Sequence, residues 1–138
     1  MSKIVLIVDD DECLARLLCI VVRRLGGLGT PATVQLAGSG RLALQRIGEQ
    51  RPDLVVLDLM LPDMNGDEVC RRLRADPATA LLPVLIISGH SLAAQIAREA
   101  GATDYMPKPF DMAALAERIQ DLLFDGEMAA QERAEPCA

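Results

Sequence analysis

The chain has 138 residues, of which 51% are hydrophobic, and its net charge is −6 at neutral pH. This length and apolar content suit one globular domain with a buried core. The acidic balance argues against binding to nucleic acids or to an anionic membrane, because both attract clustered Lys and Arg. The sequence shows neither a signal peptide nor an apolar run long enough to span a membrane, so we expect a cytoplasmic protein.

Five apolar runs alternate along the chain with five amphipathic segments. The runs predict β-strands at residues 4–8, 33–37, 54–57, 82–87 and 104–106. Apolar residues at helical spacing predict helices at residues 14–25, 42–47, 67–74, 90–100 and 112–123, the last ending near Gly126. This alternation predicts a single doubly wound α/β domain with a five-stranded parallel sheet in the order 2-1-3-4-5 and five helices.

The end of the chain differs from the rest in composition. Residues 126–138 are polar and alanine-rich and lack an apolar stripe that could face a core. We therefore expect a domain over residues 1–125 followed by a flexible C-terminal tail over residues 126–138.

Four cysteines and a single histidine, His90, do not form a metal-binding pattern. No C-x-x-C pair is present, which leaves zinc without a ligand set. We expect reduced thiols; Cys19 and Cys70 lie within predicted helices and Cys13 directly before one, where free Cys behaves as a small hydrophobic residue.

Polar side chains follow four of the predicted strands at the point where each strand ends. Asp9 and Asp10 follow the first strand, Asp58 the third and Ser88 the fourth, and Lys108 comes shortly after the fifth. The carboxyl ends of parallel strands meet at one edge of the sheet, which is where open α/β folds bind ligands. Because the first and third strands are neighbours in the predicted order, three carboxylates should converge there.

Three converging carboxylates repel one another unless a cation lies between them. Mg²⁺ suits such a site, because it takes a few carboxylates, several waters and phosphate oxygens as ligands. A carboxylate nucleophile, a cation, a hydroxyl and a lysine together fit phosphoryl transfer, with an aspartyl phosphate as the product. Taken singly, these residues are also explained as a turn acid, a helix cap and a solvated lysine; their joint position at four strand ends favours a site.

Four segments carry a resemblance to a known family. They are IVDDDE at residues 7–12, DLVVLDLMLPDMNG at 53–66, PVLIISG at 83–89 and DYMPKPF at 104–110. In this order and spacing, over residues 4–124, the chain resembles the receiver domain of two-component response regulators. The resemblance implies the CheY-like variant of the flavodoxin-like fold.

The resemblance also implies a role for each residue at the strand ends. Asp58 would be the phosphoacceptor and a Mg²⁺ ligand, Asp10 a direct Mg²⁺ ligand and Asp9 a ligand through water. The Met60 backbone carbonyl would complete the protein ligands of the Mg²⁺. Ser88 and Lys108 would bind the phosphoryl oxygens.

The same resemblance implies a conformational switch. Tyr105 would turn inward when Ser88 is drawn to the phosphoryl group, although the plainer interpretation of a half-buried strand tyrosine stays open. Pro109 occupies the family's usual cis-proline position and would hold Lys108 in place. His90 and Met60 lie where receivers tune the lifetime of the acyl phosphate, and His90 is otherwise expected on the surface.

The resemblance implies a stand-alone receiver rather than a turnover enzyme. It would accept phosphoryl from a sensor histidine kinase or a histidine phosphotransfer protein. It would signal to a downstream protein through the face of the fourth helix, fifth strand and fifth helix, as a monomer or weak dimer.

Two other functions have sequence features against them. A phosphatase of the haloacid-dehalogenase type would need a second Asp two residues after the nucleophile, and Met60 stands there and cannot transfer a proton. In a flavodoxin-like flavin binder, the acidic loop that follows the first strand would repel the flavin phosphate.

Overall fold

The computed structural model describes residues 3–26 and 32–134. Strands and helices alternate along these residues: β1 (Lys3–Val8), α1 (Glu12–Gly26), β2 (Ala32–Ala37), α2 (Gly40–Glu49), β3 (Leu54–Asp58), α3 (Gly66–Ala75), β4 (Val84–Ser88), α4 (Ala93–Ala100), β5 (Asp104–Pro107) and α5 (Met112–Ala134). The strands form one parallel sheet in the order β2-β1-β3-β4-β5. The predicted fold class and strand order are therefore confirmed.

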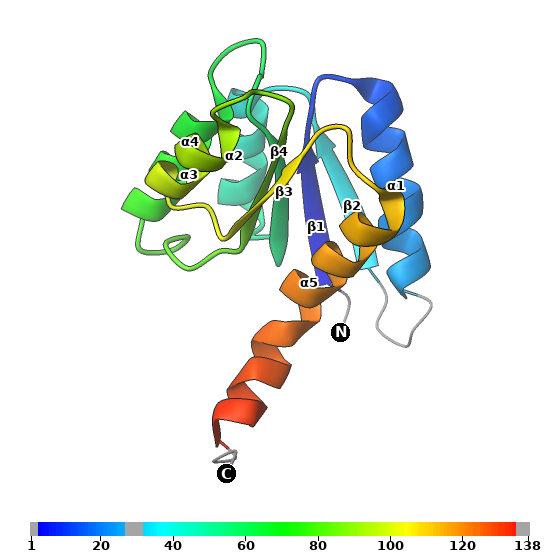
Figure 1. The fold of residues 1–138 in the computed structure, drawn as a ribbon. Helices are drawn as coiled ribbons and strands as arrows, with labels where there is room; N and C mark the ends of the chain where they lie inside the picture. The colour runs from blue at the N-terminus through cyan, green and yellow to red at the C-terminus, as the bar shows by residue number, and fades with distance from the viewer. Residues whose placement is uncertain (1–2, 27–31, 135–138) are drawn as a thin grey trace.

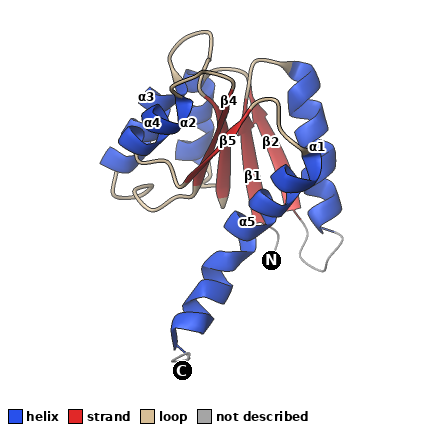
Figure 2. Cartoon of the chain, viewed as in Figure 1, coloured by secondary structure: helices blue, strands red, loops and turns tan. Residues whose placement is uncertain are grey.

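The helices cover both faces of the sheet (Figures 1 and 2). α2, α3 and α4 lie on one face and α1 and α5 on the other. The register brings the carboxyl ends of the strands to the same edge: Val8 lies opposite Leu57, Asp58 opposite Ile87, and Ser88 opposite Pro107. The first polar residue after each apolar strand therefore emerges at one end of the domain.

Each face of the sheet carries its own apolar core. Every residue of β3 and β4 is buried, which explains why their sequences are continuous apolar runs rather than alternating ones. Val69, Cys70 and Leu73 of α3 close the core on one face, and Leu18 of α1 and Ile119 of α5 close the core on the other. No helix of the described residues is both long and apolar enough to cross a membrane.

Two helix boundaries differ from the prediction. α4 begins at Ala93 and not at His90, because the residues before it form a turn in which the Leu92 N–H donates to His90 Nδ1 at 3.0 Å. α5 continues to Ala134, so the end expected near Gly126 is wrong. Gly126 costs a helix about 1 kcal/mol, but the residues after it are mostly strong helix formers and no proline follows until Pro136.

The rest of the expected C-terminal tail stays a prediction. Its division from the domain at residue 125 and its flexibility are not tested by the helix boundary. Cys137 lies outside the described residues. Of the other thiols, Cys70 is buried, Cys19 half-buried and Cys13 exposed, and all three are free.

Arg74, at the end of α3, binds the segments that lead into β4 and β5 at the amino end of the sheet. Its guanidinium donates to the carbonyl of Leu82 at 2.6 Å, to the carbonyl of Gly101 at 2.7 Å and to the Thr103 hydroxyl at 3.3 Å. Gly101 ends α4 with φ of +85°, a backbone conformation that favours glycine, and a Cβ there would lie 3.2 Å from Arg74 Cγ. One side chain thus joins α3 to the end of α4 and to the start of β5.

The buried position of β4 gives a stability prediction. Leu85 is fully buried and Leu81, in the preceding loop, is 90% exposed. We expect Leu85→Ala to lower the free energy of unfolding by about 3 kcal/mol through lost burial and a cavity. Leu81→Ala should change it by less than about 0.5 kcal/mol. Chemical denaturation measures both, and equal effects of the two substitutions would contradict the burial of β4.

Candidate functional site

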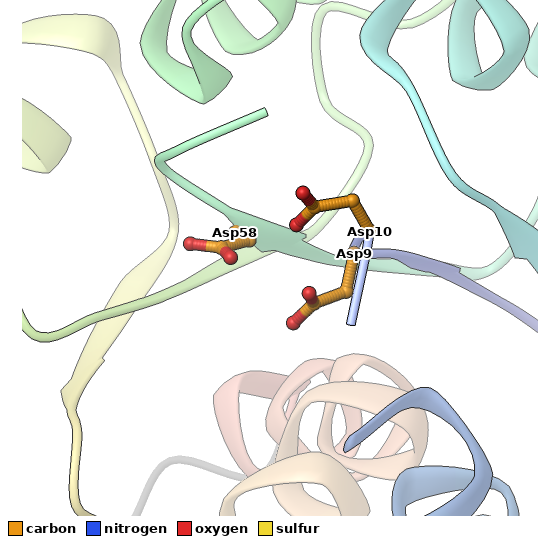
Figure 3. Close-up of side chains that lie close together, drawn as sticks. All are labelled: Asp9, Asp10 and Asp58. Carbon is orange, nitrogen blue, oxygen red and sulfur yellow. The ribbon is translucent and has the colours of Figure 1, made fainter. Parts of the chain in front are cut away.

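Three carboxylates meet where β1 and β3 end (Figure 3). Asp9 and Asp10 follow β1 directly and Asp58 is the last residue of β3. Each offers one oxygen atom, and these three atoms all lie within 4.8 Å of one another. Asp9 and Asp58 are only 8% and 9% exposed, whereas Asp10 is exposed. The predicted convergence of the three carboxylates is therefore present.

Backbone hydrogen bonds hold the two buried carboxylates in place. Oδ1 of Asp9 accepts the N–H of Asp11 at 2.8 Å, and Oδ1 of Asp58 accepts the N–H of Met60 at 3.1 Å. Asp11 itself turns away from the site, because its Oδ1 accepts the Cys13 N–H at 3.0 Å at the start of α1. Of the acids after β1, Asp11 therefore serves the helix, and Asp9 and Asp10 remain for the site.

Lys108 is the cation that reaches the carboxylates from across the sheet. Its Nζ lies 3.4 Å from Oδ2 of Asp58 and 3.7 Å from Oδ2 of Asp9. The Lys108 N–H donates to the Ser88 carbonyl at 3.0 Å, and the Lys108–Pro109 peptide bond is cis, as the resemblance implied. Three carboxylates and one ammonium group leave two negative charges uncompensated.

The electrostatics of Asp9 reflect this crowding. Burial is the main cause that raises the pKa of Asp9 above its ordinary value, and repulsion from Asp58 and Asp10 raises it further. The hydrogen bond from Asp11 and the charge of Lys108 act in the opposite direction without cancelling the rise. A hard divalent cation would remove the repulsion, and three carboxylate oxygens beside solvent are a donor set that suits Mg²⁺.

Ser88 lies on the strand next to Asp58, at the same edge of the sheet. It is the last residue of β4 and only 1% exposed. Its Oγ accepts the N–H of His90 at 3.1 Å, so the hydroxyl is held by the loop that leads to α4. Because Ser88 is the acceptor in this bond, its hydroxyl hydrogen can still be donated to another group.

Tyr105 contacts Ser88 but does not reach the carboxylates by any hydrogen bond found among the described residues. It is half-buried on β5, and its ring packs against the core on the α2–α4 face. Its hydroxyl donates to the Ser88 carbonyl at 3.5 Å, the upper limit for such a bond. The Ser88 carbonyl therefore accepts hydrogen bonds from both the Tyr105 hydroxyl and the Lys108 backbone.

The loop after Asp58 carries Met60. This residue forms an isolated antiparallel bridge with Asn65, and its side chain is largely exposed. Gly66 closes the loop by donating its N–H to the Leu59 carbonyl at 2.7 Å. A Cβ on Gly66 would lie 2.2 Å from the Asp58 carbonyl oxygen, so only glycine allows this close approach.

Asp63 is a residue of the loop after Asp58 that the sequence patterns did not single out. Its two carboxylate oxygens accept the N–H groups of Gly40 at 2.8 Å and Arg41 at 2.9 Å, at the start of α2. These hydrogen bonds, that from Arg41 first, lower the pKa of Asp63. The acid is visible in the LPDMNG segment, but its partners lie more than twenty residues earlier in the chain. Only the chain fold reveals that pairing.

The pKa of Asp9 gives a prediction for the metal-free protein. Because that pKa is raised on folding, the charge on Asp9 costs stability at neutral pH, and the cost disappears below the ordinary Asp pKa of 3.8. We expect Asp9→Asn to raise Tm by roughly 3–5 °C at pH 7, corresponding to about 1 kcal/mol. The gain should vanish near pH 3.5.

Thermal melts of Asp9→Asn and Asp10→Asn across this pH range provide the check. Asp10 is exposed, so its substitution should change Tm less than that of Asp9. A gain for Asp9→Asn that grows towards acid pH would contradict the assigned direction of the pKa.

Comparison with known proteins identifies the family. The family model of the response regulator receiver domain matches residues 5–120. The chain is 42% identical over 120 residues to the DNA-binding response regulator MtrA of Mycolicibacterium paratuberculosis, an alignment that covers 87% of this chain and 51% of MtrA. It is 39% identical over 140 residues to the response regulator MprA of Mycobacterium ulcerans, covering 100% of this chain and 57% of MprA. The chain thus spans about half the length of these relatives.

Solved structures show the same fold. A response regulator of Chloroflexus aurantiacus superposes with a TM-score of 0.81 at 38% identity, covering 89% of this chain and 98% of that one. The chemotaxis response regulator CheY4 of Vibrio cholerae gives a TM-score of 0.77 at 26% identity, covering 89% of this chain and 100% of that one. The resemblance recognised in the sequence is therefore confirmed. The chain belongs to the family of response regulator receiver domains, which are phosphoacceptor signalling modules rather than turnover enzymes.

Proposed function

We propose that this receiver accepts a phosphoryl group on Asp58 from a sensor histidine kinase or a histidine phosphotransfer protein, with Mg²⁺ in the site. One observation carries the proposal: Asp9, Asp10 and Lys108 all surround the carboxylate of Asp58 at the end of β3. A receiver needs a nucleophile, a cation site and a fixed positive charge at one place, and these residues supply the side chains for all three.

The chemistry follows from these side chains. An oxygen of Asp58 forms a bond to phosphorus, while the bond between phosphorus and the donor's histidine nitrogen breaks and leaves its electron pair on the imidazole. Asp9, Asp10, Asp58 and the Met60 carbonyl would hold the Mg²⁺, which neutralises charge on the phosphoryl oxygens. The ammonium of Lys108, now paired with Asp58, would move its contact to a phosphoryl oxygen.

Signalling would start at Ser88. Phosphorylation adds about two negative charges at Asp58, and the Ser88 hydroxyl, which accepts the His90 N–H, would donate its own hydrogen to a phosphoryl oxygen. Movement of Ser88 towards the phosphoryl group would draw the loop before α4 with it through the His90 N–H, and Tyr105, whose hydroxyl donates to the Ser88 carbonyl, would follow inward.

The downstream partner would bind the face made by α4, β5 and α5. A cavity of about 250 Å³ opens there, and its lining includes Tyr105. An ion pair between Arg118 and Asp104 joins α5 to β5 on this face.

We propose a protein as the partner and a cytoplasmic location, with the receiver as a monomer or weak dimer. MtrA is named as a DNA-binding protein, but the chain matches only about half of it.

Phosphorylation of Asp58 is tested with a small donor. Acetyl phosphate and Mg²⁺ should add one phosphoryl group to the wild-type protein, and Asp58→Asn should remain unmodified, as measured by intact-protein mass spectrometry. Chelation of Mg²⁺ should slow the labelling about a hundredfold, a typical loss when one electrostatic stabiliser of the transition state is removed. Asp67→Asn, in the first turn of α3, serves as the control and should label normally. Equal labelling of Asp58→Asn would refute the proposal.

The switch is tested at Ser88. We expect Ser88→Ala to accept phosphoryl but to lose most of the change in amide chemical shifts across α4 and β5 that beryllofluoride induces in the wild-type protein. Ser91→Ala, an exposed serine of the same loop, should keep that change. A wild-type response in Ser88→Ala would show that the hydroxyl takes no part in switching.

A further inference from the structure

The loop from Leu59 to Asn65 is hydrogen-bonded to the start of α2, which lies earlier in the chain. At the tip of this loop both carboxylate oxygens of Asp63 accept backbone N–H groups, those of Gly40 and Arg41. These are the first two residues of α2, whose N–H groups have no partner within the helix. The Ser39 hydroxyl accepts a third such group, that of Leu42, at 3.2 Å. Asp63 and Ser39 therefore cap this helix together.

Side-chain packing reinforces the same contact. A Cβ built on Gly40 would lie 2.4 Å from Cγ and 2.9 Å from Sδ of Met64, the residue after Asp63. The side chain of Met64 thus lies directly on the backbone of the helix start, in space that only a glycine leaves free. The loop tip is held to α2 by two hydrogen bonds and by this close contact.

The other end of the loop is held at Asp58. The Met60–Asn65 bridge and the bond from the Gly66 N–H to the Leu59 carbonyl close the loop on itself. Gly66 also presses against the Asp58 carbonyl, where a Cβ would lie 2.2 Å away. A closed loop that is fixed at both ends has little freedom at Met60, which lies between them.

We propose that Asp63 is a positioning residue for the metal site: by fastening the loop to the start of α2, it holds the Met60 carbonyl where a Mg²⁺ ion can use it. This inference rests on the proposed function, which assigns that carbonyl to the ion. It makes the first turn of α2 part of the support of the site, although no residue of α2 contributes a side chain to it among the described residues.

The experiment compares Mg²⁺ affinity in folded protein. Calorimetric titration with Mg²⁺ below Tm should give a dissociation constant about tenfold higher for Asp63→Ala, the lower end of the range for residues that orient metal ligands. Asp67→Ala removes the same charge from the first turn of α3 and should bind Mg²⁺ within twofold of wild type. Asp63→Asn keeps one acceptor oxygen and should lie between wild type and Asp63→Ala.

A measurement without metal separates positioning from helix capping. Hydrogen exchange of the metal-free protein should be faster in Asp63→Ala at the amides of the loop, including Met60. If Asp63 only capped the helix, exchange would increase at Gly40 and Arg41 and the loop would stay protected. Loop protection together with wild-type Mg²⁺ affinity would overturn the inference.

Gly40→Ala provides a second, independent variant. It leaves Asp63 in place and improves helix propensity, but its Cβ would displace Met64 and should likewise weaken Mg²⁺ binding. Unchanged affinity in this variant would overturn the inference even if Asp63→Ala failed to fold. A wild-type protein that binds no Mg²⁺ would instead refute the proposed function, and this inference with it.

Discussion

Three carboxylates repel one another where β1 and β3 end side by side, and the fold must offset this repulsion to form the site. Asp9 and Asp58 are largely removed from water, where like charges raise the free energy of the folded state unless positive charge lies close by. Among the described residues, Lys108 supplies that charge at ion-pair distance. It comes from the end of β5, two strands away from β3, so the order of the strands is what allows the neutralisation.

Ser88 links this charge balance to the surface of the domain. Its carbonyl accepts both the Lys108 N–H and the Tyr105 hydroxyl, while its own hydroxyl accepts the His90 N–H. A change in charge at Asp58 therefore acts on a lysine whose backbone is bonded to the residue that also contacts the tyrosine and the loop before α4. Ser88 therefore connects the buried carboxylates with the α4–β5 face of the domain.

Much of this could be predicted from the sequence, because the relevant information is local. Apolar runs that end abruptly at Asp9, Asp58 and Ser88 give both the strands and the polar residues at their ends. The alternation with helices gives a parallel doubly wound sheet, for which 2-1-3-4-5 is one of the common orders. The predicted end of α5 was wrong because Gly126 does not stop a helix when good helix formers follow it. The predicted start of α4 was wrong because the His90 side chain accepts a backbone hydrogen bond, which favours a non-helical turn before the helix. The contact of Asp63 with α2 depends on which segments the fold brings together, and no local pattern encodes that.

The hydrogen bonds of Arg74 have a mechanical consequence for α4. The guanidinium holds the carbonyl of Gly101 at the end of this helix, whereas Leu92 at its start has no side-chain cap. α4 has eight residues, so its two ends are about 12 Å apart. Side-chain hydrogen bonds therefore hold this short helix at its Gly101 end, whereas its first residue, Ala93, is held by burial and by a backbone hydrogen bond to His90. If the loop after Ser88 rearranged, these hydrogen bonds would hold the Gly101 end of α4 in place, and the helix would tilt about that end.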